Sequence, residues 1–295
     1  MGSSFLGIAR IAAYLALTLA LLPLQAALVA FRSPLRRRLP VAYHRTCCRL
    51  LGIGIEISGR PITERPALFV SNHSSYLDIV VLGALIPGCF VAKAEVGSWP
   101  FFGLLARLQQ TVFVDRKARN AVSHRDDMRS RLAAGDGLIL FPEGTSSDGN
   151  RTLPFKTALF SVANLRTGDD RPLPVQPVSI TATALDGIPL GRELRSLYAW
   201  YGAMDLAPHL WRMVRLGRFT VRVEFHEAVT IDAFPSRKAL ADHCRRAVSA
   251  GVARAVVGRP RPPAREPSVE AVDEVTPPET AGTSPGTGVS SREQS

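Results

Sequence analysis

The chain has 295 residues, of which 46% are hydrophobic, so it can bury a sizeable core in one large domain or two small ones. Its formal net charge of +11 favours an anionic partner, namely nucleic acid, anionic lipid or an acidic carrier protein. The four cysteines contain no C-x-x-C pair, which argues against a zinc site or a disulfide framework and favours reduced thiols over a disulfide pair.

An uncharged stretch at residues 11–31 is long enough to cross a bilayer. Four arginines follow it within residues 32–38, whereas Arg10 alone precedes it. The positive-inside rule then places the rest of the chain in the cytoplasm. We therefore predict a membrane-anchoring segment at residues 1–39.

Three alternatives compete with a membrane span for this segment. A signal peptide is disfavoured because no small-x-small cleavage site is evident near residues 24–30. A buried helix remains open. A helix that lies in the membrane interface also remains open, because Pro23 and Gln25 interrupt the apolar pattern.

Short β-rich runs alternate with helix-like runs over residues 40–258, which predicts an α/β domain with a mixed, largely parallel sheet flanked by helices. The expected strands are 53–58, 67–72, 89–94, 111–116, 137–142, 174–180 and 219–225. The expected helices are 75–86, 101–110, 119–135, 156–166 and 237–257. Residues 259–295 are rich in Pro, Ser, Thr, Glu and Gly, and their composition predicts a disordered tail.

The segment SNHSSYLD (71–78) joins the end of one expected strand to the start of a helix. Active residues of parallel sheets gather at the carboxyl ends of strands, and the chain reverses there, so Asp78 can turn back toward His73. A carboxylate on one imidazole nitrogen orients the ring while the other nitrogen takes a proton. Such a pair is more often structural than catalytic when it stands alone, because Asn, His and Ser are also common in loops and helix caps.

Three other expected strands end in distinctive residues. The strand 111–116 ends in Asp115 and Arg116, and an arginine there could hold a phosphate or a carboxylate. The strand 137–142 runs into PEGT, a tight turn where glycine allows close approach of a ligand. The strand 174–180 contains two prolines, which predicts an edge position or a strand start.

These motifs in this order resemble those of the glycerolipid acyltransferase family, over about residues 40 to 235. The resemblance implies direct transfer of an acyl group from a thioester to a hydroxyl, with His73 as general base and Asp78 as the residue that orients it. It implies no metal, no cofactor and no covalent intermediate, with acyl carrier protein or acyl-CoA as the co-substrate.

The resemblance also implies a site for the polar head of the acceptor, made of Arg116, Glu143 and Gly144 with Thr145 beside them. Lys156 is a further candidate for contact with an anion. The stretch LPVQP (173–177) matches a motif that shapes the acyl-donor side of the family's site.

The segments at 89–116, 146–160 and 197–217 resemble the branch that acylates lyso-ornithine lipid in Gram-negative bacteria. We therefore expect this acceptor, with lysophosphatidic acid as the alternative, and Asp148 is a candidate partner for the ornithine ammonium. The expected partners are the acyl donor, a lysolipid and membrane lipids. A nucleic-acid binder is disfavoured because no helix-turn-helix or zinc finger is evident. A membrane scaffold that kept the fold without catalysis is the second alternative.

Overall fold

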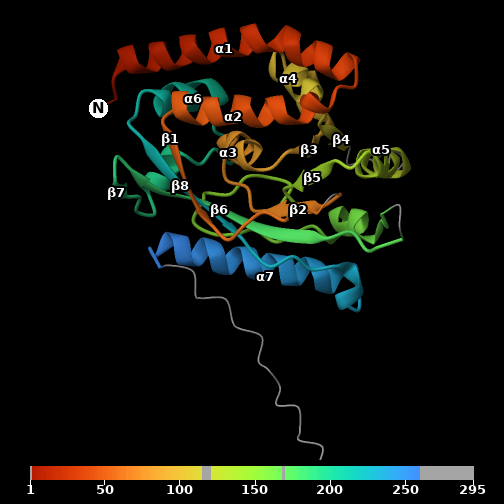
Figure 1. Cartoon of the computed structure of the whole chain (residues 1–295). Coiled ribbons are helices and arrows are strands. Elements are labelled where there is room, and N and C mark those ends of the chain that lie inside the picture. The colour runs from red at the N-terminus through yellow and green to blue at the C-terminus, as the bar shows by residue number, and fades with distance from the viewer. Residues whose placement is uncertain (1, 65, 115–120, 168–169, 260–295) are drawn as a thin grey trace, which may run out of the picture. The chain divides into compact units, whose positions relative to one another are not determined.

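The computed structural model describes residues 2–64, 66–114, 121–167 and 170–259. The described residues form one eight-stranded sheet with helices on both faces (Figure 1). The strands are β1 (Ile53–Ser58), β2 (Leu68–Ser71), β3 (Gly88–Lys93), β4 (Val112–Val114), β5 (Gly137–Leu140), β6 (Val175–Leu185), β7 (Ile188–Pro189) and β8 (Phe219–Phe225). The α-helices are α1 (Ser4–Ala30), α2 (Arg38–Leu50), α3 (Leu77–Leu85), α4 (Phe102–Leu108), α5 (Ala121–Ala133), α6 (Leu206–Val214) and α7 (Arg237–Val256).

Short 3-10 helices fill the connections. They are η1 (Pro34–Arg37), η2 (Ala94–Ser98), η4 (Thr157–Asn164), η5 (Leu194–Leu197) and η6 (Ile231–Ala233). The segment expected as a helix at 156–166 is thus a 3-10 helix. The sequence did not predict α2, α6 or the two-residue β7.

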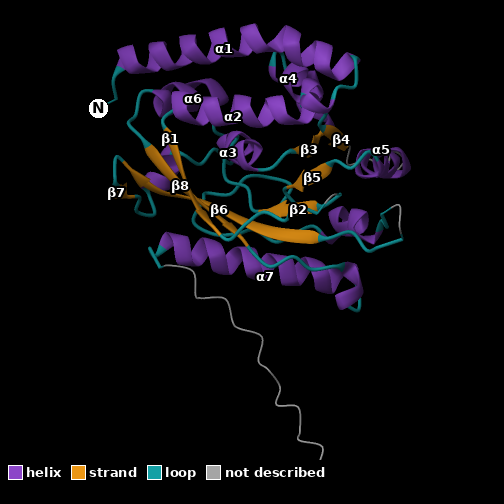
Figure 2. Cartoon of the chain, viewed as in Figure 1, coloured by secondary structure: helices purple, strands orange, loops and turns teal. Residues whose placement is uncertain are grey.

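Both faces of the sheet are covered by helices, as the layers in Figure 2 show. Phe69 packs into a cluster with residues of α2, α3 and α6. Its neighbours Leu68 and Val70 pack into a second cluster with residues of α5, α7 and η4. Side chains alternate between the faces of a strand, so β2 is apolar throughout because both faces are buried.

The strand order is β1-β8-β6-β2-β5-β3-β4, with β7 paired to β6. All pairs are parallel except those of β6 with β7 and β8. The two prolines of residues 174–180 were expected to mark an edge position or a strand start. The strand start is confirmed, since β6 begins at Val175, whereas the edge position is not, since β6 lies between β2 and β8. Pro177 is tolerated there because it precedes the ladder with β8, which begins at Val178, and its carbonyl accepts the His226 backbone N–H at 3.0 Å.

Helix α1 lies alongside α2 and α6 (Figure 1) and contacts the domain through its polar residues. Arg10 donates to the carbonyls of Val214 and Leu216 at 3.1 and 2.6 Å. Further along, the Thr18 hydroxyl lies 2.9 Å from that of Tyr43. The opposite face is apolar and exposed, with Phe5 83%, Ile8 61% and Leu19 62% accessible. By length and composition alone, α1 could cross a membrane.

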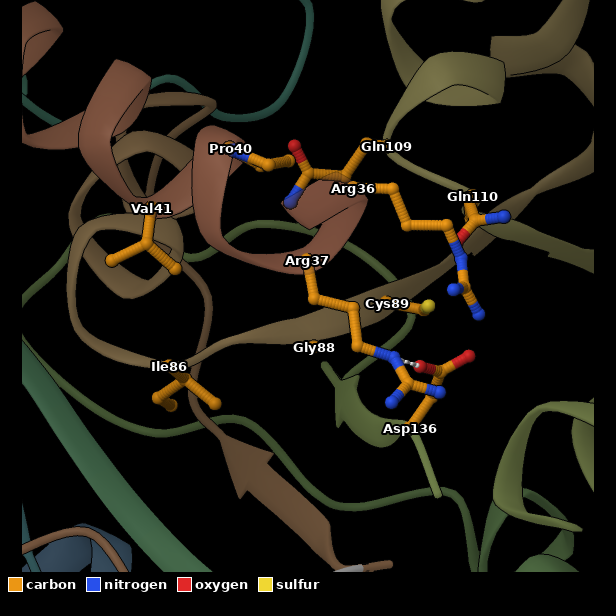
Figure 3. A pocket seen from close by; sticks show the side chains of 10 residues that line it. All are labelled: Arg36, Arg37, Pro40, Val41, Ile86, Gly88, Cys89, Gln109, Gln110 and Asp136. Atoms are coloured by element: carbon orange, nitrogen blue, oxygen red, sulfur yellow. Dashed lines mark hydrogen bonds and ion pairs between the residues drawn. The ribbon is translucent and has the colours of Figure 1, made fainter. Parts of the chain in front are cut away.

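The linker after α1 is fastened to the amino edge of the sheet. Arg37 forms an ion pair with the buried Asp136, just before β5 (Figure 3). Gln25 of α1 donates to the carbonyls of Arg36 and Leu108 at 3.1 and 3.0 Å. The cavity beside this ion pair has a volume of about 10 Å³, which is room for about one water molecule. The contacts of Arg37 and Gln25 hold α1 and the linker to the domain.

The four cysteines were predicted to be reduced thiols, and in the structure all four are free and buried: Cys47, Cys48, Cys89 and Cys244. Burial raises the pKa of the Cys89 thiol to about 12. These thiols are therefore protonated and packed as small apolar groups. The tail predicted at 259–295 lies outside the described residues from residue 260 onward.

Candidate active site

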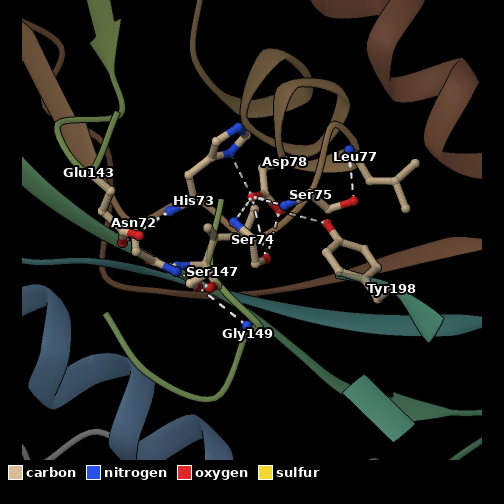
Figure 4. Close-up of polar contacts among 11 residues, drawn as sticks. Asn72, His73, Ser74, Ser75, Leu77, Asp78, Glu143, Ser147, Gly149 and Tyr198 are labelled. Atoms are coloured by element: carbon tan, nitrogen blue, oxygen red, sulfur yellow. Dashed lines mark hydrogen bonds and ion pairs between the residues drawn. The ribbon is translucent and has the colours of Figure 1, made fainter. Parts of the chain in front are cut away.

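His73 lies in the loop between the end of β2 and the start of α3, at the carboxyl edge of the sheet (Figure 4). Its Nδ1 is 3.1 Å from Oδ2 of Asp78, which stands in the first turn of α3. The imidazole stacks on Phe141 with ring centroids 4.2 Å apart. The chain reversal between strand and helix therefore brings the two side chains together, as the five-residue spacing predicts.

Asp78 is completely buried and surrounded by hydrogen-bond donors. Its Oδ2 accepts the backbone N–H groups of Ser74 and Ser75 at 2.6 and 2.9 Å. Its Oδ1 accepts the hydroxyl of Tyr198 at 3.0 Å. These donors fix the carboxylate so that one of its oxygens faces the imidazole.

The arrangement defines the roles of the two imidazole nitrogens. Nδ1 is held by Asp78, so Nε2 is the nitrogen that can take a proton from a substrate hydroxyl. The His73 side chain is 20% exposed, whereas that of Asp78 is inaccessible. A reacting group can thus reach the imidazole, and the orienting carboxylate stays shielded from water.

Glu143 follows β5 and is 2% exposed. Its Oε1 accepts the backbone N–H of His73 at 3.3 Å, while Oε2 has no hydrogen-bond partner among the described residues. Burial raises the pKa of Glu143 to about 8, although backbone hydrogen bonds from His73 and Leu153 oppose the shift. Glu143 therefore supports the loop that carries the imidazole.

The turn after Glu143 requires a glycine. Gly144 has φ +67°, and a Cβ built on it would lie 2.5 Å from Nζ of Lys156. The Lys156 ammonium therefore lies against this turn, and the backbone N–H of Lys156 donates to the Pro142 carbonyl at 2.9 Å. Thr145, next in the chain, is exposed. The structure thus gathers all the predicted site residues that it describes at one edge of the sheet.

Comparison with known proteins agrees with this geometry. A family model described as acyltransferase matches residues 54–181, which include His73, Asp78 and Glu143. A lyso-ornithine lipid O-acyltransferase of Brucella abortus is 44% identical over 86% of this chain and 96% of its own length. The chain belongs to the acyltransferase family.

Two further comparisons place this acyltransferase more broadly. A 1-acyl-sn-glycerol-3-phosphate acyltransferase of Neisseria meningitidis is 34% identical over 74% of this chain and 82% of its own length. The crystal structure of the 1-acyl-sn-glycerophosphate acyltransferase of Thermotoga maritima has a TM-score of 0.59 and 20% identity. It covers 83% of this chain and 95% of that protein, so the two share a fold. The chain is an O-acyltransferase enzyme, which excludes the scaffold alternative.

The remaining expected substrate contacts of this acyltransferase are Arg116 and the stretch 173–177. Arg116 lies outside the described residues, so its role stays a prediction. The stretch 173–177 is buried throughout, and Val175 pairs with Leu68 at the start of β2. That stretch therefore lies inside the sheet and runs toward the carboxyl edge, where Pro177 pairs with Val70, one residue before the end of β2.

Sequence reasoning missed two residues that support the acyltransferase site. Asn72 donates to and accepts from the backbone of Ile180, at 2.9 Å in each case, and so joins β2 to β6 beside His73. Tyr198 holds Asp78 from a distant loop. Asn72 could have been found from its place beside the motif histidine, whereas nothing in the sequence near Tyr198 pairs it with Asp78.

The described residues of the acyltransferase contain no group of three or more His, Cys, Asp or Glu side chains that could hold a metal. His44 and His209 are both buried and contact neutral groups, Gln109 at 2.8 Å and the Tyr76 hydroxyl at 3.1 Å. Burial lowers the pKa of His44 to about 4, which keeps this ring neutral in the core.

Proposed function

We propose that this acyltransferase transfers an acyl group from acyl carrier protein or acyl-CoA to the hydroxyl of a lysolipid, with lyso-ornithine lipid as the acceptor. The observation that carries the proposal is the pair of His73 and Asp78. Nδ1 of His73 and Oδ2 of Asp78 lie 3.1 Å apart at the carboxyl edge of the sheet. The chain that carries this pair is 44% identical to a lyso-ornithine lipid O-acyltransferase.

The reaction follows from the free Nε2 of His73. This nitrogen takes the proton of the acceptor hydroxyl while the hydroxyl oxygen attacks the thioester carbonyl. The tetrahedral intermediate then collapses, the carbon–sulfur bond breaks, and the proton passes from His73 to the departing thiolate. Asp78 stabilises the imidazolium that exists between the two proton transfers. The products are an ester and a thiol.

The choice of acceptor is based on the activities named for the relatives of this chain. Lyso-ornithine lipid carries its hydroxyl on an amide-linked fatty acid, and its head group has a carboxylate and an ammonium. The second candidate is 1-acyl-sn-glycerol-3-phosphate, because relatives of that name are 33–34% identical to this chain. Both acceptors present a hydroxyl to His73, and they differ in the charge of the head group.

We further propose that the enzyme acts at the cytoplasmic leaflet of the bacterial inner membrane, with α1 in the interface. The contacts of Arg10, Thr18 and Gln25 tie both halves of α1 to the domain, which is difficult to reconcile with a helix that crosses the bilayer alone. The exposed apolar face of α1 and the exposed Trp99 and Leu104 near α4 supply surface for lipid. The net charge of +11 favours anionic lipid and an acidic carrier protein.

The proposal is tested with purified enzyme in mixed micelles. Radiolabelled acyl carrier protein or acyl-CoA is offered with lyso-ornithine lipid or with lysophosphatidic acid, using wild type and His73→Ala. We expect product from lyso-ornithine lipid that His73→Ala abolishes. Product from lysophosphatidic acid alone would overturn the acceptor, and undiminished product with His73→Ala would overturn the mechanism.

A further inference from the structure

An open pocket with a volume of about 360 Å³ lies at the carboxyl edge of the sheet, beside the end of α7. Three arginines line it, Arg151, Arg192 and Arg195, together with Asp148 and Asn150. Its size falls in the range of small-molecule sites. The pocket contains neither His73 nor Asp78, so its arginines have a role other than proton transfer.

Arg195 is the buried member of the group, at 3% exposed. Its guanidinium donates to Oδ1 of Asn150 at 2.7 Å and to the Leu190 carbonyl at 2.9 Å. All its hydrogen-bond acceptors among the described residues are neutral, and its buried Nε has no acceptor there. The charge of Asp148, in the same lining, acts on Arg195 from a distance, but no hydrogen bond or ion pair joins the two side chains. A buried cation without an anion in direct contact is costly, so this site favours an anionic ligand.

The pocket adjoins the catalytic loop. Gly149 has φ +75°, and a Cβ built on it would lie 3.7 Å from Cβ of Ser74 and 3.8 Å from Cδ of Arg195. The backbone N–H of Ser147 donates to the His73 carbonyl at 2.9 Å. A single turn of chain, residues 147–150, therefore separates the loop of His73 from the arginines.

The pocket also contains a negative charge. Asp148 accepts the backbone N–H of Asn150 through Oδ1 at 3.0 Å, and Oδ2 makes no hydrogen bond with a described residue. Exposed Arg151 and Arg192 stand with it in the same lining. Arginines suit a carboxylate and an aspartate suits an ammonium, so the lining matches a ligand that carries both charges. A phosphate monoester would use the arginines and be repelled by Asp148.

We infer that this pocket binds the zwitterionic amino-acid head group of the acceptor, the carboxylate against the arginines and the ammonium against Asp148. The inference rests on the proposed function and assigns its head-group specificity to this pocket, in place of the turn at Glu143 and Gly144 that the resemblance suggested. The turn at residues 147–150 then couples recognition of the head group to the position of His73.

The experiment compares Arg192→Gln with wild type on two acceptors, lyso-ornithine lipid and its methyl ester, which lacks the negative charge. The variant loses a charged hydrogen bond to the carboxylate, so we expect KM for lyso-ornithine lipid to rise about tenfold or more at nearly unchanged kcat. On the methyl ester, wild type and variant should have equal KM. Asp148→Asn should raise KM for lyso-ornithine lipid and leave KM unchanged for an acceptor whose amine is acetylated.

Arg237→Gln is the matched control, since Arg237 is an exposed arginine at the other end of α7, and it should keep wild-type constants on both acceptors. Equal KM increases on the free acid and the methyl ester would overturn the inference. An increase confined to KM of the donor would also overturn it and assign the arginines to the donor's phosphate. Failure of the proposed function is distinct, because wild type itself would then give no product from lyso-ornithine lipid.

Discussion

The hydroxyl of Tyr198 donates a hydrogen bond to Oδ1 of Asp78 at 3.0 Å, across 120 residues of chain. Both side chains are buried, and burial together with the neighbouring Asp78 raises the pKa of Tyr198 well above its usual value. The hydroxyl is therefore protonated at every physiological pH and can only donate to the carboxylate. Tyr198 is thus a positioning residue, since it acts on His73 through Asp78.

Replacing Tyr198 with Phe removes that donor and keeps the ring, which packs against Phe219 at 5.8 Å between centroids. One hydrogen bond to a charged group is lost, so kcat should fall by about tenfold while KM for both substrates is unchanged. Asp78 loses one of the donors that fix its carboxylate, so it orients His73 less firmly and the loss should fall on kcat alone. A rise in KM at unchanged kcat would contradict the positioning role.

Asp78→Asn tests the orienting carboxylate itself. The backbone N–H groups of Ser74 and Ser75 would then meet an amide, and His73 would lose the charge that stabilises its protonated form. We expect kcat to fall by at least about a hundredfold with the protein still folded, as judged by circular dichroism. Near-normal turnover in Asp78→Ala, with none in His73→Ala, would show that the imidazole needs no orienting acid.

The sequence predicts the parts of this site that depend on local chain geometry. His73 and Asp78 meet because five residues span one reversal from strand to helix, and that spacing is visible without a structure. Tyr198 and Arg195 reach the site from a loop that follows β7, and their positions depend on how the whole sheet is assembled. No local pattern marks such partners, so they could not be predicted.

The fold shows the same difference between features set by local sequence and features set by contacts between distant segments. The alternation of apolar strands and helices predicts the largely parallel sheet. The order of the strands depends on contacts between distant segments, so the prolines of β6 were compatible with a strand start or an edge, and only the assembled sheet shows that β6 is an internal strand. Helix α2 was missed because its apolar residues are interrupted by arginines and Pro40, and its buried face is formed by polar His44 together with Cys47 and Cys48.

Glu143 should make stability depend on pH. Its pKa of about 8 in the folded protein exceeds the ordinary value of 4.5, so between these pH values the folded state holds a proton that the unfolded state has released. The stabilisation is complete below about pH 4.5 and is lost as pH rises through 8, with a slope of up to about 1.4 kcal/mol per pH unit. Glu143→Gln does not titrate, so its melting temperature should fall less between pH 5.5 and 8.5 than that of wild type.

The control for this measurement is Glu193→Gln, a change of an exposed glutamate. It should show the same decrease in melting temperature as wild type over that pH range. An identical decrease in Glu143→Gln would mean that Glu143 is ionised in the folded protein at neutral pH.

The position of α1 can be tested by cysteine labelling, because all four native cysteines are buried. Ser4→Cys places a thiol at the exposed start of α1, and Leu35→Cys places one after its end, where Leu35 is 51% exposed. If α1 lies in the cytoplasmic interface, a membrane-impermeant maleimide should label both variants in inside-out vesicles and neither in intact spheroplasts. A helix that crosses the bilayer would expose the introduced thiol of Ser4→Cys on the opposite side, so labelling of this variant in spheroplasts alone would contradict the interfacial position. Leu35→Cys reports the orientation of the vesicles in either case, because residue 35 is cytoplasmic in both arrangements.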